Sequence, residues 1–141
     1  MADKFDLKTL FSFRGRAGRR EFWRLMLALI ALSFGLSLLG AVPGGQIIGI
    51  PFSLAGNIAQ WAVVARRLHD LGRSGWWQVP AMALGAAALV RAVQLGPAAV
   101  EANPGLAGAL LGAMLLSMAF LVVIGAVRGD AGPNRFGQPP G

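Results

Sequence analysis

Four long apolar segments, separated by short breaks, constrain this chain more than any other feature of its sequence. They cover roughly residues 22–40, 47–65, 76–95 and 106–127. A helix of about 20 residues is about 30 Å long, which matches the hydrocarbon core of a bilayer. Only 13% of the residues are charged, whereas soluble domains carry about 25%. The sequence therefore predicts an all-α, polytopic membrane protein with four transmembrane helices.

The breaks between these segments contain residues that end helices or leave the bilayer. Val42-Pro43-Gly44-Gly45 follows the first segment, and the pair Arg66-Arg67 begins a polar loop after the second. We expect a single membrane domain over residues 1–141, with a short basic N-terminal segment (1–21) and a Gly/Pro-rich tail (128–141) without regular structure. Because basic residues precede a first apolar run that is long, that run is predicted to be a retained helix and not a secretory signal.

Basic residues are distributed very unevenly along the chain. The N-terminal segment with Arg24 holds seven, the segment 66–73 three and the tail two, which together make 12 of the 13 lysines and arginines. Cytoplasmic loops of membrane proteins carry an excess of Lys and Arg. Both termini and the central loop are therefore predicted to be cytoplasmic. This role explains the net charge of +7 without a nucleic-acid partner.

Six arginines fall close to the predicted cytoplasmic ends of the spans, and glycines are interleaved with them. They are Arg14, Arg16, Arg66, Arg67, Arg73 and Arg135. One hypothesis is that they converge on an anionic headgroup or phosphate, which the guanidinium fork suits. The alternative is that they only set the orientation of the chain in the membrane.

His69 is the single histidine of the chain, and Asp70 follows it. A histidine beside an acid is typical of a proton-transfer pair. However, neighbouring side chains on a helix point about 100° apart, and Asp70 is better placed to pair with Arg66 or Arg67. We therefore interpret His69 and Asp70 first as a structural hub of the cytoplasmic loop.

Asn57 and Gln60 form a polar pair near the middle of the second predicted span. Residues three apart share a helix face, so the two amides either bond to another helix or line a path for a solute. With one histidine and no cysteine, the chain offers no metal cluster. No cofactor is predicted either.

Three strings identify a resemblance: FRGRAGRREFW, ARRLHDLGRSGWW after the second span, and GPNRFGQPP in the tail. Together they resemble the family of small bacterial inner-membrane proteins known as domain of unknown function 805. The resemblance extends from about Phe11 to Pro139. It implies a small, multi-helix protein of the bacterial cytoplasmic membrane and no established activity.

The function that these observations favour is a non-enzymatic membrane module whose cytoplasmic arginine-rich surface binds anionic lipid or a partner protein. A homo-oligomer or a partner membrane protein is compatible with this hypothesis. The alternative is a small transporter or channel-like subunit that uses the Asn57/Gln60 face. An enzyme that acts on a phosphorylated or lipid substrate through His69 and Asp70 is the third and weakest hypothesis.

Overall fold

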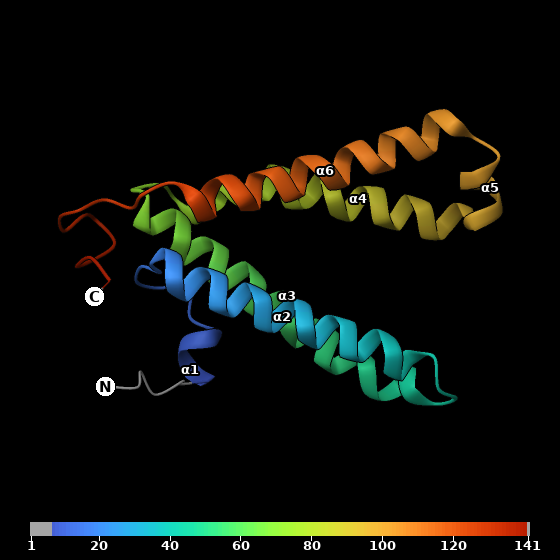
Figure 1. Cartoon of the computed structure of the whole chain (residues 1–141), viewed down its shortest axis with the longest axis horizontal. Coiled ribbons are helices and arrows are strands. Elements are labelled where there is room, and N and C mark those ends of the chain that lie inside the picture. Colours follow the sequence, from blue (N-terminus) through green and yellow to red (C-terminus); the bar gives the residue numbers. More distant parts are fainter. Residues whose placement is uncertain (1–6, 141) are drawn as a thin grey trace. The chain divides into compact units, whose positions relative to one another are not determined.

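The computed structural model describes residues 7–140, with all their side chains except those of Leu7, Lys8, Gln46 and Ile48. The helices in this range are α1 (Leu7–Leu10), α2 (Arg19–Gly40), α3 (Gly45–Asp70), the 3-10 helix η1 (Gly75–Gln78), α4 (Val79–Leu95), α5 (Pro97–Glu101) and α6 (Pro104–Ala126) (Figure 1). The described residues contain no strand, and a single isolated bridge joins Asn134 and Gly137. The predicted all-helical class is confirmed.

The chain packs as two compact units. The first contains the residues up to Gly75 and returns to include the tail from Arg128, and the second runs from Trp76 to Val127. The first unit therefore holds α1, α2, α3 and the tail, and the second holds α4, α5 and α6. The sequence alone treats these segments as one domain.

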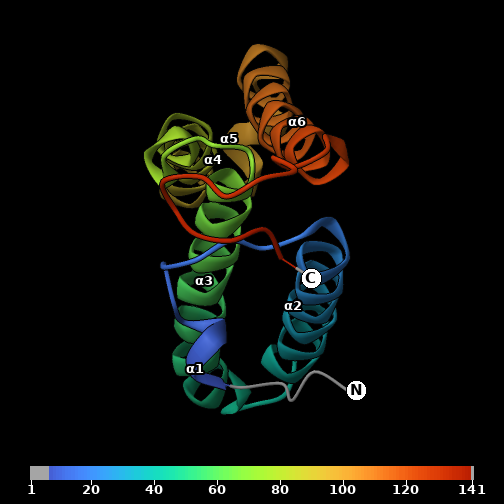
Figure 2. The same ribbon diagram turned by 90° about the vertical axis from the view of Figure 1, so that its left-hand side faces the viewer.

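In the first unit, α2 and α3 lie side by side as an antiparallel pair (Figure 2). The turn between them depends on two glycines. Gly44 has a φ of +80°, which side chains other than glycine disfavour. A Cβ on Gly45 would lie 2.0 Å from the carbonyl oxygen of Leu39. The glycine pair thus allows α3 to begin directly beside the end of α2.

Helix α3 continues five residues beyond its predicted end and stops at Asp70. The segment from Arg66 to Asp70, predicted to be part of a loop, is therefore helical. Charged residues end a membrane span, but arginine is a good helix former and favours the C-terminal turn of a helix. Gly72, with a φ of +68°, follows the helix end.

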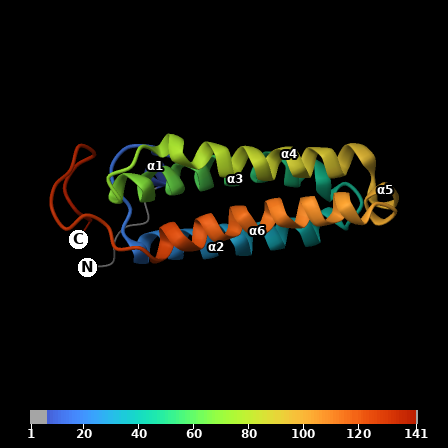
Figure 3. The same ribbon diagram turned by 90° about the horizontal axis from the view of Figure 1, so that it is seen from above.

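In the second unit, α4 and α6 run alongside each other (Figure 3). Each has a proline in its first turn, where the missing N–H costs least. The side chain of Asn103 caps α6 by accepting a hydrogen bond from the amide of Leu106 at 3.0 Å. The hydroxyl of Ser117 in α6 lies 2.9 Å from the carbonyl oxygen of Ala81 in α4, so one polar contact links the two helices.

Three helical segments of the described chain are long and apolar enough to cross a membrane: Arg19–Gly40, Gly75–Leu95 and Pro104–Ala126. They correspond to the first, third and fourth predicted spans. Large apolar side chains such as Leu27 and Phe34 in α2 are mostly exposed, which suits a helix whose solvent is lipid. The second predicted span, 47–65, lies within the 26 residues of α3, which is not among these three.

Candidate functional site

Asp70 is the centre of a buried ion-pair network at the end of α3. Its side chain accepts from two arginines of different segments, and the residue is 3% exposed. Arg16 approaches one carboxylate oxygen with Nε at 3.0 Å and Nη2 at 2.8 Å. Arg67, one helical turn before Asp70, donates from Nη1 to the other oxygen. We call Arg16, Arg67 and Asp70 the Asp70 cluster.

Arg16 also binds the backbone of the tail. Its Nη1 donates to the carbonyl oxygen of Gly132 at 2.8 Å and more weakly to that of Gly137 at 3.4 Å, and its Nη2 donates to that of Asp130. Meanwhile Arg67 Nη1 lies 3.2 Å from the carbonyl oxygen of Ala17. The Asp70 cluster therefore joins the N-terminal motif, the end of α3 and the tail.

Two glycines make room for this arrangement. A Cβ on Gly129 would lie 2.0 Å from Oδ2 of Asp70, and a Cβ on Gly72 would lie 2.8 Å from Oδ2 of Asp130. The amide of Asp130 donates to the carbonyl oxygen of Asp70 at 2.8 Å. The tail thus approaches α3 backbone to backbone, which only a residue without a side chain permits at position 129.

His69 contacts both the N-terminal motif and the tail. Its Nδ1 lies 3.0 Å from the carbonyl oxygen of Gly15. Its ring stacks on Phe136 with centroids 3.9 Å apart and planes 7° from parallel, and the guanidinium of Arg135 lies 4.7 Å from the same phenyl ring. Burial lowers the pKa of His69 below its usual value, and the positive charge of Arg135 lowers it further.

These contacts separate His69 from Asp70. The Asp70 carboxylate accepts from Arg16 and Arg67, whereas the His69 ring faces Gly15 and Phe136. This is not the geometry of an acid–base pair, in which the carboxylate orients the imidazole. Among the residues whose side chains are described, no three His, Asp or Glu gather as metal ligands would.

Arg66 pairs with Glu21 rather than with Asp70. Its Nη1 lies 2.6 Å from Oε1 of Glu21, and its carbonyl oxygen accepts from the amide of Ala17 at 3.0 Å. Arg66 is 2% exposed, and its Nε and Nη2 atoms are buried with no hydrogen-bond partner among the described residues. The sequence offered Arg66 and Arg67 as partners for Asp70, and the structure pairs Asp70 with Arg67.

The six arginines of the anion hypothesis divide into two groups. Arg16, Arg66 and Arg67 are buried in the first unit. Arg14, Arg73 and Arg135 are exposed. The structure therefore brings the three sequence motifs together, but it directs only half of these arginines outward.

The polar pair Asn57 and Gln60 lies in the middle of α3. Asn57 is exposed, and its amide donates to the carbonyl oxygen of Ser53 in the same helix at 2.8 Å. Gln60 is half-buried. The role of this pair between helices stays a prediction.

Sequence reasoning missed several residues of this site. Glu21 is visible in the sequence only as an acid in the first turn of α2, and nothing there shows that it meets Arg66. The tail that contains Gly129, Asn134 and Phe136 was predicted to lack regular structure. Asn134 donates to the carbonyl oxygen of His69 at 2.9 Å. The one available signal for Asn134 and Phe136 was the string GPNRFGQPP, because it is one of the three strings that carry the family resemblance.

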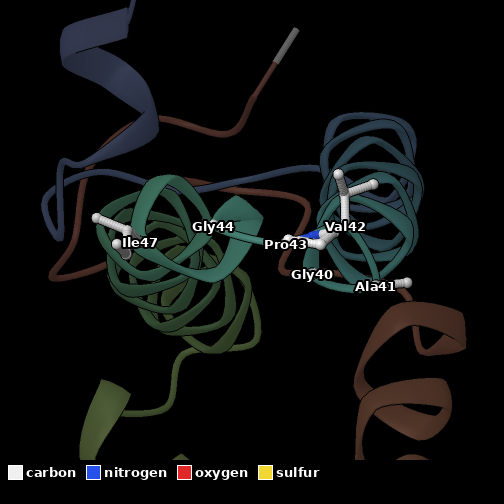
Figure 4. A pocket seen from close by; sticks show the side chains of 6 residues that line it. All are labelled: Gly40, Ala41, Val42, Pro43, Gly44 and Ile47. Atoms are coloured by element: carbon white, nitrogen blue, oxygen red, sulfur yellow. The ribbon is translucent and has the colours of Figure 1, made fainter.

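A shallow pocket lies at the opposite end of the α2–α3 pair. Figure 4 shows its lining, which consists of Gly40, Ala41, Val42, Pro43, Gly44 and Ile47. These side chains carry no charge and no hydrogen-bonding group. The pocket therefore offers little to orient a polar ligand.

Known proteins similar to this chain include two inner membrane proteins and one uncharacterized protein of Escherichia coli. It is 40% identical to inner membrane protein YhaH of Escherichia coli (strain K12) over 77 residues, which are 50% of this chain and 64% of that protein. It is 33% identical to the uncharacterized protein YiiR of the same strain over 138 residues, 92% of this chain and 86% of YiiR. Inner membrane protein YhaI is 32% identical over 73 residues, 50% of this chain and 62% of that protein.

No solved structure matches the chain. The sequence profile of one family, described as protein of unknown function (DUF805), matches residues 10–138. That range includes the first two strings and all but the last two residues of the third. The chain belongs to the DUF805 family.

Proposed function

We propose that this protein crosses the bacterial inner membrane four times, with both termini and the segment 71–75 in the cytoplasm. The relatives named as inner membrane proteins support the location. Helix α3 supports a further span in addition to the three long apolar segments, because it packs antiparallel beside α2. If α2 crosses the bilayer, an antiparallel helix that packs along it crosses the bilayer in the opposite direction. With 26 residues, α3 is about 39 Å long, enough for a hydrocarbon core of about 30 Å.

The exposed face of α3 also suits lipid. Ile47, Ile50, Leu54 and Ile58 are all more than half exposed, and their spacing of three or four residues places them along one stripe of the helix. In water such a stripe would require a covering partner, whereas lipid covers it at no cost. The breaks 41–44 and 96–103 carry no Lys or Arg, so the positive-inside rule assigns them to the opposite side.

The proposed activity is non-enzymatic binding of anionic lipid by an exposed arginine surface. We define this surface as the exposed arginines of the first unit: Arg14, Arg19, Arg20, Arg24, Arg73, Arg128 and Arg135. Its support is one observation. The acids Asp70 and Glu21 pair with arginines inside the unit, whereas the side chains of the outer arginines are exposed and can reach an anionic leaflet, where each adds about 1 kcal/mol.

The test compares lipid retention by variants of the full-length protein. The protein is reconstituted in nanodiscs of phosphatidylcholine with phosphatidylglycerol, and the lipids that it retains are counted by native mass spectrometry. The triple variant Arg19→Gln, Arg20→Gln, Arg24→Gln should retain fewer phosphatidylglycerol molecules. The variant with lysine at the same three positions should retain as many phosphatidylglycerol molecules as the parent, because lysine keeps the positive charge that attracts the lipid. Added salt should weaken retention, because the Debye length is about 10 Å at 0.1 M.

The control is Arg91→Gln, since Arg91 is an exposed arginine of α4 outside this surface. Unchanged lipid retention in the triple glutamine variant would contradict the proposal. Retention of a co-purifying acidic protein in place of lipid would assign the surface to a protein partner. The transporter hypothesis receives no support from the described contacts of Asn57, whose amide bonds within its own helix.

A further inference from the structure

We propose that Arg66 forms one defined oxyanion site, which binds a phosphate group through the edge of its guanidinium that carries Nε and Nη2. The proposal rests on the proposed function, since it names one specific anion-binding point beneath the exposed arginine surface. The phosphate belongs either to the headgroup of an anionic phospholipid or to free inorganic phosphate. Both sources present the same pair of oxygens to the guanidinium.

The hydrogen bonds of Arg66 leave that edge free. Nη1 is bound to Glu21 at 2.6 Å, while Nε and Nη2 are buried and have no acceptor among the described residues. A guanidinium stays protonated in proteins, so both groups remain donors. A buried donor without an acceptor is unfavourable, and more so when it is charged. Two oxygens of a phosphate match such an edge in a bidentate hydrogen bond.

The charge balance around Arg66 also favours an anion. Three arginines, Arg16, Arg66 and Arg67, are buried in this part of the first unit, and Asp70 is the buried carboxylate among the described residues. Glu21 adds a second carboxylate from the surface. Among these three buried arginines and the two carboxylates that pair with them in the described chain, positive charges therefore outnumber negative ones by one. Buried charges are stable only when paired.

The position of Arg66 gives a phosphate a route to this edge. The Arg66 carbonyl oxygen accepts from the amide of Ala17, so the residue lies beside the start of α2, whose cap Gly18 supplies no side-chain hydrogen bond. The first turn of a long helix favours anions. The side chain of Glu21, in that turn, is 32% exposed, so in the proposed site a phosphate reaches the guanidinium from the side on which Glu21 lies.

The experiment uses the full-length protein with two probes. Nanodiscs of phosphatidylcholine with phosphatidylglycerol supply the lipid phosphate, and inorganic phosphate titrated in detergent supplies the free ion. Arg66→Lys keeps the charge but loses the bidentate edge. It should reduce retention of one lipid, or the affinity for inorganic phosphate, by about tenfold. Arg91→Lys, at an exposed position of α4 outside the exposed arginine surface, should leave both unchanged.

A second variant keeps the proposal testable if Arg66→Lys does not fold. Glu21→Gln removes the competing carboxylate, keeps an oxygen for Nη1, and should raise anion affinity in the parent but not in the Arg66→Lys background. Equal retention by Arg66→Lys and the parent would overturn the site. If the triple glutamine variant still loses lipid in that case, the proposal of an exposed arginine surface would stand without the Arg66 site. A response to phosphatidylglycerol but not to inorganic phosphate identifies a lipid site, and the reverse identifies a soluble ligand.

Discussion

Asp70 is the residue on which the junction of the N-terminal motif, the end of α3 and the tail depends, because it pairs with two buried arginines. Asp70→Asn keeps the shape of the side chain but leaves Arg16 and Arg67 without their counter-charge. Removal of one partner of a buried ion pair costs about 3–5 kcal/mol. We therefore expect a large fall in thermal stability in detergent. Glu101→Gln, at an exposed site of α5, should change stability by less than about 0.5 kcal/mol, and equal effects of the two variants would refute the hub.

The second prediction at this scale concerns pH. The pKa of His69 is lowered in the folded protein, mainly by burial, so the folded state favours the neutral ring. The unfolded state binds the proton more readily, and stability therefore rises with pH in this range. As the pH falls below about 6.5 toward the folded pKa, this contribution is lost. Thermal unfolding curves of the parent should shift down between pH 7.5 and 5.5 more than those of His69→Gln, and parallel shifts would exclude this role for His69.

The residue types at the junction could be predicted from the sequence, but their pairings could not. The sequence indicated Asp70 as a hub because it is the acid among many arginines, and the structure adds which arginines it meets. Arg16 is 54 positions away from Asp70 in the chain, and helix periodicity carries no information over that distance. The pairing of Arg66 with Glu21 is hidden for the same reason. The apolar runs, by contrast, are local signals, and three of the four predicted spans match helices of suitable length and hydropathy.

At the scale of the element, the α4–α6 pair depends on one close contact. A Cβ on Gly85 would lie 3.1 Å from the hydroxyl oxygen of Ser117, so Gly85→Ala should push the helices apart or displace the hydroxyl. Ser117→Ala alone removes a hydrogen bond worth about 0.6 kcal/mol in a membrane. The double variant should be more stable than the sum of the two single changes predicts, because the alanine at 85 then meets no oxygen.

Thermal unfolding in detergent measures this coupling. Gly112→Ala is the matched control, since nothing lies within 4 Å of a Cβ at Gly112 in α6. Its replacement by a better helix former should be neutral or stabilising. Additive effects of the changes at 85 and 117 would show that the two residues do not meet.

At the scale of the whole molecule, the proposed topology makes a prediction that the chain is well suited to test. It contains no cysteine, so single cysteines can be introduced without background labelling. Val42→Cys and Glu101→Cys should react with a membrane-impermeant maleimide in intact cells, since both lie in breaks without basic residues. Gln138→Cys should react only after the membrane is opened. Labelling of Gln138→Cys in intact cells would reverse the orientation, and protection of Val42→Cys there would remove the second span.

The contacts of Arg16 also set the order in which the protein is assembled during synthesis. Its acceptors at Asp130 and Gly132 follow it by 114 and 116 residues, so all the helices have been made before these carbonyl groups emerge from the ribosome. Until then, the guanidinium of Arg16 lacks these two acceptors. A nascent chain that ends before residue 128 can hold its helices, yet it lacks the segment that covers this guanidinium. Closure of the tail over Arg16 therefore follows the synthesis of every described helix.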